Sequence, residues 1–571
     1  MATKSYWQRF QRGRISRRRL LAATGAGAAG LAVVAACGGG GDGGGDAPQV
    51  VASPTGAPVT PMAQPVRGGR YQIGTNLELD SLDPHIAIAA AVAYFPRVYN
   101  VLVRQSAQKP DFIVKDLASE YETPEPGGTE WIFTIRPGVK IAPNTLGIPE
   151  RDLDSEDAMA SYQRIKDEPL ANAGAFVVPW LDSHEAPNPQ TYIWKTPTPY
   201  AWFLLNIGLF TATIPPRELL EMGADVMREN AVGAGPFVAT SFTEGEGLGL
   251  DRNINYYGTD PNNNDEPIPY IDGMDVSIFP DRTALRTAFG SGQLHTYGAE
   301  NQAEADELIA QFDTYQGSRD PVFTYISFTM NVTKPPWDNP NVRKAAMHAL
   351  NRQEYVDRVY GGDAQANGLV HWPTGPFALS EEELEELQPY DPELSKRLIQ
   401  EAGFDLPLEI NVMFPSSSAI EEHDQHLPIW LVKMEDAGFK VKQDAQDFVT
   451  WLDNYTEKNY DASLALNQVY ETPEVNLDFQ HSKGPAGNEI FSNGLQDADV
   501  DAAIDATKGI TDSEELVAAV QEVQRLIYSK GPAFLPIVSP FSRTLYWNFV
   551  KNIPAGIGTT GLIVNDWWLE L

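Results

Sequence analysis

The stretch ISFTMNVTKPPWDNPNVRKAAMHALNRQEYVDRVYGG, residues 326–362, contains two helix patterns in succession. After Asn339-Pro340, apolar residues recur at the i, i+3, i+4, i+7 and i+8 spacing of a buried helix stripe. Gly361-Gly362 would end the second helix. The apolar members of the two patterns are Val342, Ala345, Ala346, Ala349 and Leu350, then Tyr355, Val356 and Val359. We expect Trp337 to pack against the start of the first helix.

Alternation of apolar and polar residues predicts strands on either side of this helical region. Residues 70–75, 131–136 and 408–414 show this pattern. Helix starts are marked by S/T-x-x-E capping boxes, at Ser380–Glu383, Ser418–Glu421 and Thr511–Glu514. Strands that alternate with helices predict an α/β architecture. Because a single core rarely serves more than about 250–300 residues, we expect at least two lobes.

The amino-terminal residues have the pattern of an export signal. Residues 1–19 carry seven cations and no acid, and the uncharged segment 20–36 is rich in Ala, Gly, Leu and Val. This order predicts a signal peptide over residues 1–36. Within it, Ser16–Leu21 resembles a twin-arginine motif, with Leu20 in place of the more usual Phe. General secretory export stays open as the alternative route.

Cys37 is the only cysteine of the 571 residues, and Val34-Ala35-Ala36-Cys37 resembles a bacterial lipobox. An acylated Cys37 would anchor the mature chain to a membrane. Residues 37–67 are rich in glycine and proline, a composition typical of a tether. We therefore expect an exported lipoprotein held at the outer face of the cytoplasmic membrane, in the cell envelope or periplasmic space.

The charge of the chain bears on its partners. The formal net charge is −35, and removal of the seven cations of residues 1–36 lowers it to −42. A body this acidic repels nucleic acid, so we expect no nucleic-acid partner. A folded part without cysteine must depend on its hydrophobic core for stability. We also expect the protein to be a monomer.

Several segments, taken in order along the chain, resemble the family 5 extracellular solute-binding proteins, the oligopeptide, dipeptide and nickel receptors of ATP-binding-cassette importers. They span about residues 68–571. The segments are GGRYQIGTNLELDSLDPH (68–85), WIFTIRPGVK (131–140), LDSEDAMASYQRI (153–165), GAGPFVATSF (233–242), DRNINYYG (251–258), residues 326–362, PYDPELSKRLIQEAGF (389–404), SNGLQDADVDAAIDAT (492–507) and GPAFLPIV (531–538).

The resemblance implies a two-lobed periplasmic-binding-protein fold of the large family 5 type, with an extra subdomain in lobe one. Lobe one would comprise residues 68–320 and 536–571, and lobe two residues 321–535. Such receptors close by a hinge around their ligand and then deliver it to a membrane permease. The expected ligand is an oligopeptide.

The resemblance also selects candidate ligand residues. In peptide-binding members an acidic side chain of lobe two pairs with the peptide amino terminus, and the matching stretch here is LALNQVYETPEVNLDFQHS, residues 464–482. No Asp stands at the usual place, so the candidates are Glu471, the nearest acid, Tyr470 and Asn467. Trp372 lies in a segment that commonly faces the cleft. Tyr470, near the place of the usual Asp, could instead stack on a sugar ring. An oligosaccharide therefore stays open as the alternative ligand.

The chain shows no motif of an enzyme or of a resident cofactor. We find no H-E-x-x-H, no G-x-S-x-G and no cysteine nucleophile. The run EEHDQH, residues 421–426, is interpreted as a solvated helix start rather than a metal site. We therefore expect no catalytic activity, no cofactor and no metal. An anchored hydrolase, and a sensor or chaperone-like lipoprotein, remain the alternatives of other classes.

Overall fold

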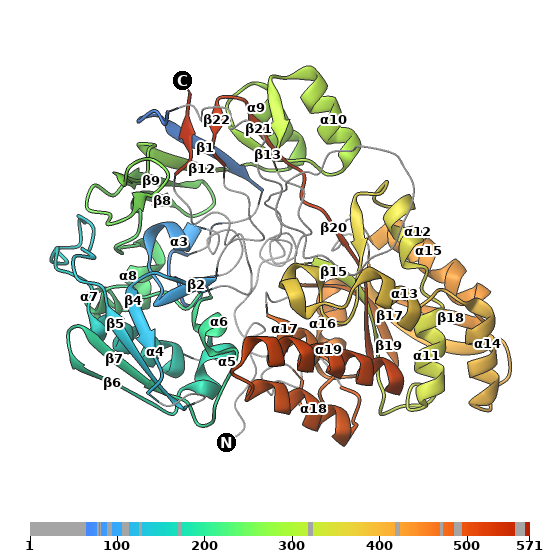
Figure 1. The fold of residues 1–571 in the computed structure, drawn as a ribbon. Coiled ribbons are helices and arrows are strands. Elements are labelled where there is room, and N and C mark those ends of the chain that lie inside the picture. The colour runs from blue at the N-terminus through green and yellow to red at the C-terminus, as the bar shows by residue number, and fades with distance from the viewer. Residues whose placement is uncertain are drawn as a thin grey trace, which may run out of the picture.

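The structure is a computed structural model. It describes residues 64–76, 79, 81–87, 94–105, 113–124, 128–168, 171, 173–209, 211–317, 324–416, 423–468, 472–484, 494–553 and 566–570. Figure 1 shows two bodies of secondary structure side by side: the elements up to β14 together with β21 to β23 form one, and the elements from β15 to β20 form the other. The expected two-lobed α/β fold is present.

Lobe one contains two larger sheets and a smaller one. The first has the order β1-β12-β9-β8, in which β1 pairs in parallel with β12. The second has the antiparallel order β4-β5-β7-β6 and forms the extra subdomain, with α4 packed on β6 and β7. The third has the order β13-β21-β14. Strand bounds are β1 Arg70–Thr75, β4 Ala118–Glu122, β5 Glu130–Ile135, β6 Ser183–Asn188, β7 Thr191–Lys195, β8 Phe237–Thr243, β9 Gly247–Arg252, β12 Gly273–Ile278, β13 Thr296–Gly298, β14 Thr314–Gln316 and β21 Thr544–Trp547.

Short helices and strand pairs complete lobe one. Their bounds are α3 Phe95–Val98, β2 Val103–Gln105, β3 Ile113–Lys115, α4 Ser155–Asp167, α5 Gly174–Val177, η2 Val178–Trp180, α6 Phe203–Ile207, α7 Arg217–Met222, α8 Ala224–Glu229, β10 Thr259–Asp260, β11 Glu266–Pro267, α9 Arg282–Gly290, α10 Gln302–Gln311, β22 Val550–Lys551 and β23 Trp568–Leu569.

Lobe two is built on a six-stranded sheet of order β16-β20-β15-β19-β17-β18, with helices packed around it. Strand bounds are β15 Thr324–Met330, β16 Ala364–Ala366, β17 Leu408–Pro415, β18 Phe439–Gln446, β19 Ala462–Gln468 and β20 Phe534–Pro540. Helix bounds are α11 Pro340–His348, α12 Arg352–Arg358, η3 Trp372–Phe377, α13 Glu381–Leu387, α14 Pro392–Glu401, α15 His423–Asp436, α16 Phe448–Thr456, α17 Pro473–Asp478, α18 Ala498–Lys508 and α19 Ser513–Lys530.

The helix and strand patterns of the sequence agree with these elements. The stripe after Asn339-Pro340 forms α11, whose Val342, Ala345 and Ala346 are fully buried. Trp337 is fully buried as well, and its ring lies against Phe328 and Phe439. The prediction that Trp337 packs in the core is therefore confirmed.

Two of the three predicted capping boxes fall on described residues, and one of them is wrong by a residue. Ser380 caps α13 by accepting a hydrogen bond from the N–H of Glu383. At α19 the cap is Asp512 rather than Thr511, because its carboxylate accepts from the N–H groups of Glu514 and Glu515. A carboxylate at this position also stabilises the positive end of the helix dipole. The third box, Ser418–Glu421, lies outside the described residues.

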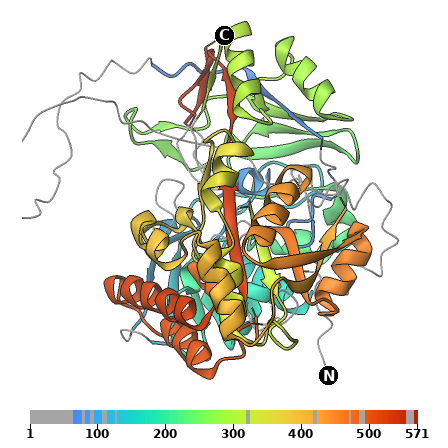
Figure 2. The ribbon, with the colours of Figure 1, turned by 90° about the vertical axis from the view of Figure 1, so that its right-hand side faces the viewer.

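The chain passes between the lobes through β20 and β21. Because β20 pairs with β15 and β16, residues 536–540 belong to the sheet of lobe two, whereas the resemblance assigned them to the return into lobe one. The crossing follows at residues 541–543. Figure 2 shows these C-terminal strands (red) rising from the six-stranded sheet toward the sheet that holds β1 and β12. We place the change of lobe at about residue 540.

Arg543 binds both lobes within this crossing. Its guanidinium forms a buried ion pair with Asp363, which directly precedes β16, and Nη1 donates to the carbonyl of Glu300 in lobe one at 3.3 Å. Since both charged partners are almost fully buried, the pair fixes how the crossing segment sits against each lobe.

Candidate functional site

Two of the candidate ligand residues, Asn467 and Trp372, fall within the described residues. Asn467 is the second-last residue of β19, and its backbone pairs with Tyr325 of β15. Tyr470 and Glu471 follow the strand but lie outside the described residues, as does Cys37. Trp372 is the first residue of η3. The structure therefore gives the chain positions of Asn467 and Trp372, and their ligand contacts stay predictions.

Helix α17 begins directly after this segment and is buried along its whole length. Thr472 precedes the helix, and all six residues from Pro473 to Asp478 are buried. A helix that carries two carboxylates, Glu474 and Asp478, would not be buried without partners for them. Figure 1 shows α17 facing α5 and α6 of lobe one, so these partners can come from both lobes.

The partner of Glu474 comes from lobe one. The hydroxyl of Tyr200 donates a hydrogen bond to Oε2 of Glu474. Asn206 Nδ2 donates to the Tyr200 oxygen at 2.5 Å and lies 3.5 Å from the same carboxyl oxygen. Tyr200 is 1 % exposed, Asn206 2 % and Glu474 5 %. These three side chains form a hydrogen-bonded group that spans the two lobes, which we call the interlobe junction.

Aromatic packing holds the lobe-one side of the junction. The indole of Trp180 stacks on the Tyr200 ring, with centroids 3.4 Å apart and planes 10° apart. The neighbouring Trp202 is 1 % exposed, and its ring contacts Phe377 of η3 at 5.2 Å. Between them, the N–H of Ala201 donates to the carbonyl of Lys508 at 2.6 Å. The segment 200–202 therefore contacts lobe two through backbone and side chains.

The lobe-two side of the junction carries charge. Lys508 of α18 lies 3.2 Å from Asp478 and 3.0 Å from Asp505. Burial raises the pKa of the Glu474 carboxyl to about 8, and nearby Asp478 adds to this effect. Burial lowers the pKa of Lys508, but Asp478, Glu474 and Asp505 outweigh it, and the pKa is raised. The junction thus holds a carboxyl that favours its neutral form beside a cation that keeps its charge.

Sequence reasoning did not find the junction. Glu474 lies three residues beyond the predicted Glu471, and its partner Tyr200 is 274 residues away along the chain. The only signal in the sequence was the tripeptide Thr472-Pro473-Glu474, which is typical of a helix start with an acid in the first turn.

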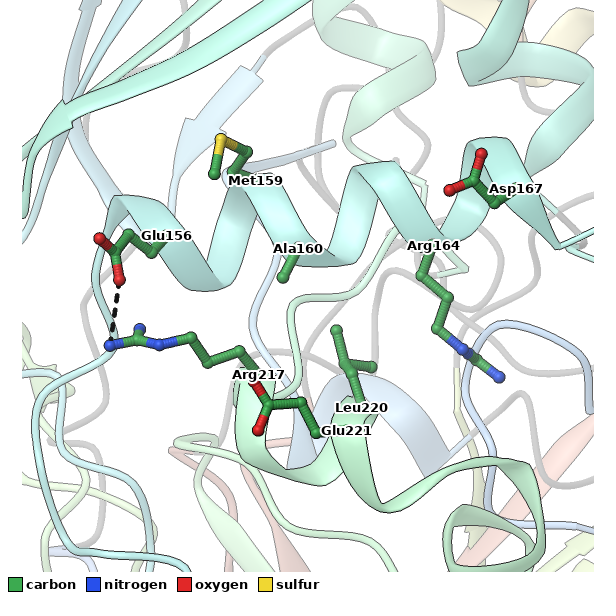
Figure 3. A pocket seen from close by; sticks show the side chains of 8 residues that line it. All are labelled: Glu156, Met159, Ala160, Arg164, Asp167, Arg217, Leu220 and Glu221. Carbon is green, nitrogen blue, oxygen red and sulfur yellow. Dashed lines mark ion pairs between the residues drawn. The ribbon is translucent and has the colours of Figure 1, made fainter.

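A hollow lies on the subdomain of lobe one, between α4 and α7 (Figure 3). It has a volume of about 530 Å³ and is open to solvent. Its cations are already paired: Arg217 lies 3.3 Å from Glu156, and Arg164 forms an ion pair with the buried Asp83 at 2.6 Å. Charged groups that neutralise one another offer little to a charged ligand, so we do not assign a ligand to this groove.

His426, the last residue of the run 421–426, differs from the interpretation of this run as a solvated helix start, whereas residues 421 and 422 lie outside the described residues. His426 is fully buried in lobe two, with Nε2 2.8 Å from the hydroxyl of Tyr360 and its ring stacked on Tyr355. The imidazole of His426 therefore packs in the core of lobe two rather than in solvent. Within the described ranges, no three His, Cys, Asp or Glu side chains are grouped as a metal would require. Among all the described residues, no helix has the length and apolar character needed to cross a membrane.

Comparison with known proteins identifies the fold and the family. The chain is 24% identical to heme-binding protein A of Haemophilus influenzae over 467 residues, which cover 77% of this chain and 81% of that protein. It is 22% identical to di/tripeptide-binding protein 2 of Pseudomonas aeruginosa over 441 residues, 72% of this chain and 79% of that protein. Among solved structures, the periplasmic binding protein DppA of Helicobacter pylori in complex with the peptide STSA has a TM-score of 0.70 at 18% identity. The match covers 89% of this chain and 99% of DppA.

The model of the bacterial extracellular solute-binding proteins, family 5 Middle, matches residues 113–488. This range includes the subdomain of lobe one, most of the six-stranded sheet and helix α17 with its junction carboxylates. The chain therefore belongs to the family 5 bacterial extracellular solute-binding proteins.

Proposed function

We propose that this protein is a lipid-anchored receptor that captures oligopeptides between its two lobes and delivers them to the permease of an ATP-binding-cassette importer. Membership of family 5 carries the proposal, because the family consists of solute-binding proteins. Two compared proteins support a peptide ligand: one is a di/tripeptide-binding protein, and the other holds the peptide STSA. The proposed role is binding, without catalysis.

The interlobe junction supports capture by closure. The hydrogen bond from Tyr200 to Glu474 joins the two lobes, so it exists only while the lobes touch. A ligand that binds residues of both lobes would stabilise the same arrangement, since it adds affinity that the separated lobes lack. In the sequence, the predicted ligand residues Tyr470 and Glu471 directly precede Thr472 and α17.

Native mass spectrometry of the gently purified protein tests the ligand class. We expect added masses that resolve into amino-acid residues, with loss of these masses in Glu471→Gln if the carboxylate binds the peptide amino group. Added masses spaced by hexose units would replace the peptide with an oligosaccharide. A heme mass with visible absorption would replace it with heme, the ligand in the name of the Haemophilus relative. Turnover of a peptide or polysaccharide would instead support a hydrolase.

A further inference from the structure

Glu474 is a buried acid that has hydrogen-bond partners in the other lobe. Its own lobe supplies α17 and α18 around it, and lobe one supplies the hydroxyl of Tyr200 and the amide of Asn206. Figure 1 shows α6 and α17, which bound this contact, well below the crossing near β21 along the boundary between the lobes. A rotation of the lobes about that crossing would therefore separate Tyr200 from Glu474 and admit water to the carboxyl.

Burial and the neighbouring carboxylate of Asp478 raise the pKa of Glu474, and they outweigh Lys508 and the two hydrogen bonds, which lower it. Asp478, on the next turn of α17, is a second carboxylate at close range. Lys508 is the cation that faces the pair, and its ammonium lies 3.2 Å from Asp478 and 3.0 Å from Asp505. From lobe one, the ionisable group in contact is Tyr200, whose own pKa is raised well above its usual value by burial and by Glu474. The next titratable group is His481, whose Nε2 lies 3.4 Å from the carboxylate of Asp505.

The hydrogen bonds are compatible with a neutral carboxyl. Tyr200 donates to Oε2 of Glu474, and Asn206 Nδ2 donates to the Tyr200 oxygen. Oε2 is thus an acceptor, which leaves Oε1 as the oxygen that carries a proton. A protonated carboxyl would sit in this buried group at a lower free-energy cost than a carboxylate, because no desolvated charge has to be balanced.

We propose that closing of the lobes takes up one proton at Glu474, so that an acidic medium favours the closed arrangement and a basic medium weakens it. The proposal rests on the proposed function only in that closure is taken to hold the ligand. The proton enters from solvent, binds the carboxylate as the lobes meet and leaves when they part; no other bond changes.

The direction and size of the pH effect on closing follow from the two environments of the Glu474 carboxyl, with the lobes apart and with the lobes closed. With the lobes apart, the carboxyl faces water and its pKa returns toward the ordinary value of 4.5; in the closed arrangement burial raises the pKa to about 8. Between these values the closed form binds more protons, so the closing constant falls as pH rises. The fall approaches tenfold per pH unit, and between pH 5.5 and 7.5 these values give about 70-fold. The effect fades below pH 4.5 and above pH 8.

Small-angle X-ray scattering of the purified, ligand-free protein tests this without knowledge of the ligand. We expect the radius of gyration to increase between about pH 5.5 and 8.5 in the wild type. Glu474→Gln keeps the size of the side chain and removes its charge, so this variant should keep a compact form at both pH values. Tyr200→Phe removes the hydrogen bond but not the burial, so it should open more readily and still respond to pH.

An infrared spectrum supplies a second readout if a variant alters packing. At about pH 6.5 the wild type minus Glu474→Gln difference should contain the carbonyl band of a protonated carboxyl. A radius of gyration that does not respond to pH, or that responds equally in Glu474→Gln, overturns the proposal, as does a difference spectrum with only a carboxylate band. Failure to find a peptide by mass spectrometry would overturn the ligand assignment and leave these outcomes unaffected.

Discussion

The ion pair between Arg164 and Asp83 joins two distant segments of lobe one. Asp83 belongs to the sequence LDPH and is fully buried, and Arg164 lies in the last turn of α4. The two guanidinium nitrogens donate to the two carboxylate oxygens of Asp83 at 2.9 and 2.6 Å. Nη1 of Arg164 also lies 2.8 Å from Nδ1 of His85. A single residue thus connects the subdomain helix to the turn that follows β1.

Replacement of Arg164 by methionine should leave the Asp83 carboxylate buried without its cation. Loss of one partner of a buried pair costs about 3–5 kcal/mol of unfolding free energy. For a unit the size of lobe one, this corresponds to a fall in Tm of about 5–8 °C. The reverse change, Asp83→Asn, should cost less, because Arg164 is 16% exposed and can turn its charge toward water.

Denaturant unfolding of the two single variants and the double variant forms a thermodynamic cycle, which measures the coupling free energy between Arg164 and Asp83. We expect a coupling free energy above about 2 kcal/mol, with the double variant more stable than Arg164→Met alone. The reasoning is refuted if the unfolding free energy of Arg164→Met lies within about 1 kcal/mol of the wild type, or if the two single effects are additive. Either result would mean that this ion pair does not stabilise lobe one. Lys195→Met, which breaks an exposed pair with Glu130, is the control and should leave the unfolding midpoint nearly unchanged.

Three further predictions concern the core, the anchor and pH. Trp337→Ala should destabilise lobe two by about 3–5 kcal/mol in denaturant unfolding, whereas Ile254→Ala, at a side chain 81% exposed, should be nearly neutral. Cys37→Ser should move the protein from the membrane to the soluble fraction and abolish labelling by a fatty acid, and persistent labelling would contradict the lipobox assignment. Burial lowers the pKa of His295 to about 4, so the folded state resists its protonation. Stability should therefore fall as pH decreases from about 6.5 to 4, and His295→Gln should show a smaller fall in acid unfolding.

Local patterns predicted the elements of this fold well. The strand over residues 70–75 is β1 with the same bounds, and the pattern at residues 408–414 is β17 with one added residue. Such patterns succeed because periodicity depends on which face of a single element is buried. The cap of α19 was displaced by one residue because Asp and Thr both suit that position, and only the geometry decides between neighbours.

The contacts between elements could not be predicted in the same way. His426 was interpreted as solvated because its neighbours in sequence are charged, yet Tyr360 and Tyr355 bury it from another part of lobe two. The same holds for Glu474, whose environment is set by Tyr200 and Asn206 from the other lobe. The burial of a polar residue depends on partners that are distant in sequence, and a single sequence does not indicate which partners will meet.

The two ends of the interlobe contact differ in a way that bears on closure. At the crossing, Arg543 binds Asp363 of lobe two and the carbonyl of Glu300 of lobe one, beside residues 541–543 where the chain itself joins the two lobes. At the other end, the contact between Tyr200 and Glu474 has no covalent support. A difference of a few kcal/mol at this end therefore suffices to shift the balance between open and closed lobes. Because Glu474 closely follows the predicted ligand segment, a bound ligand and a bound proton would act on the same end of the molecule, and each would strengthen the other.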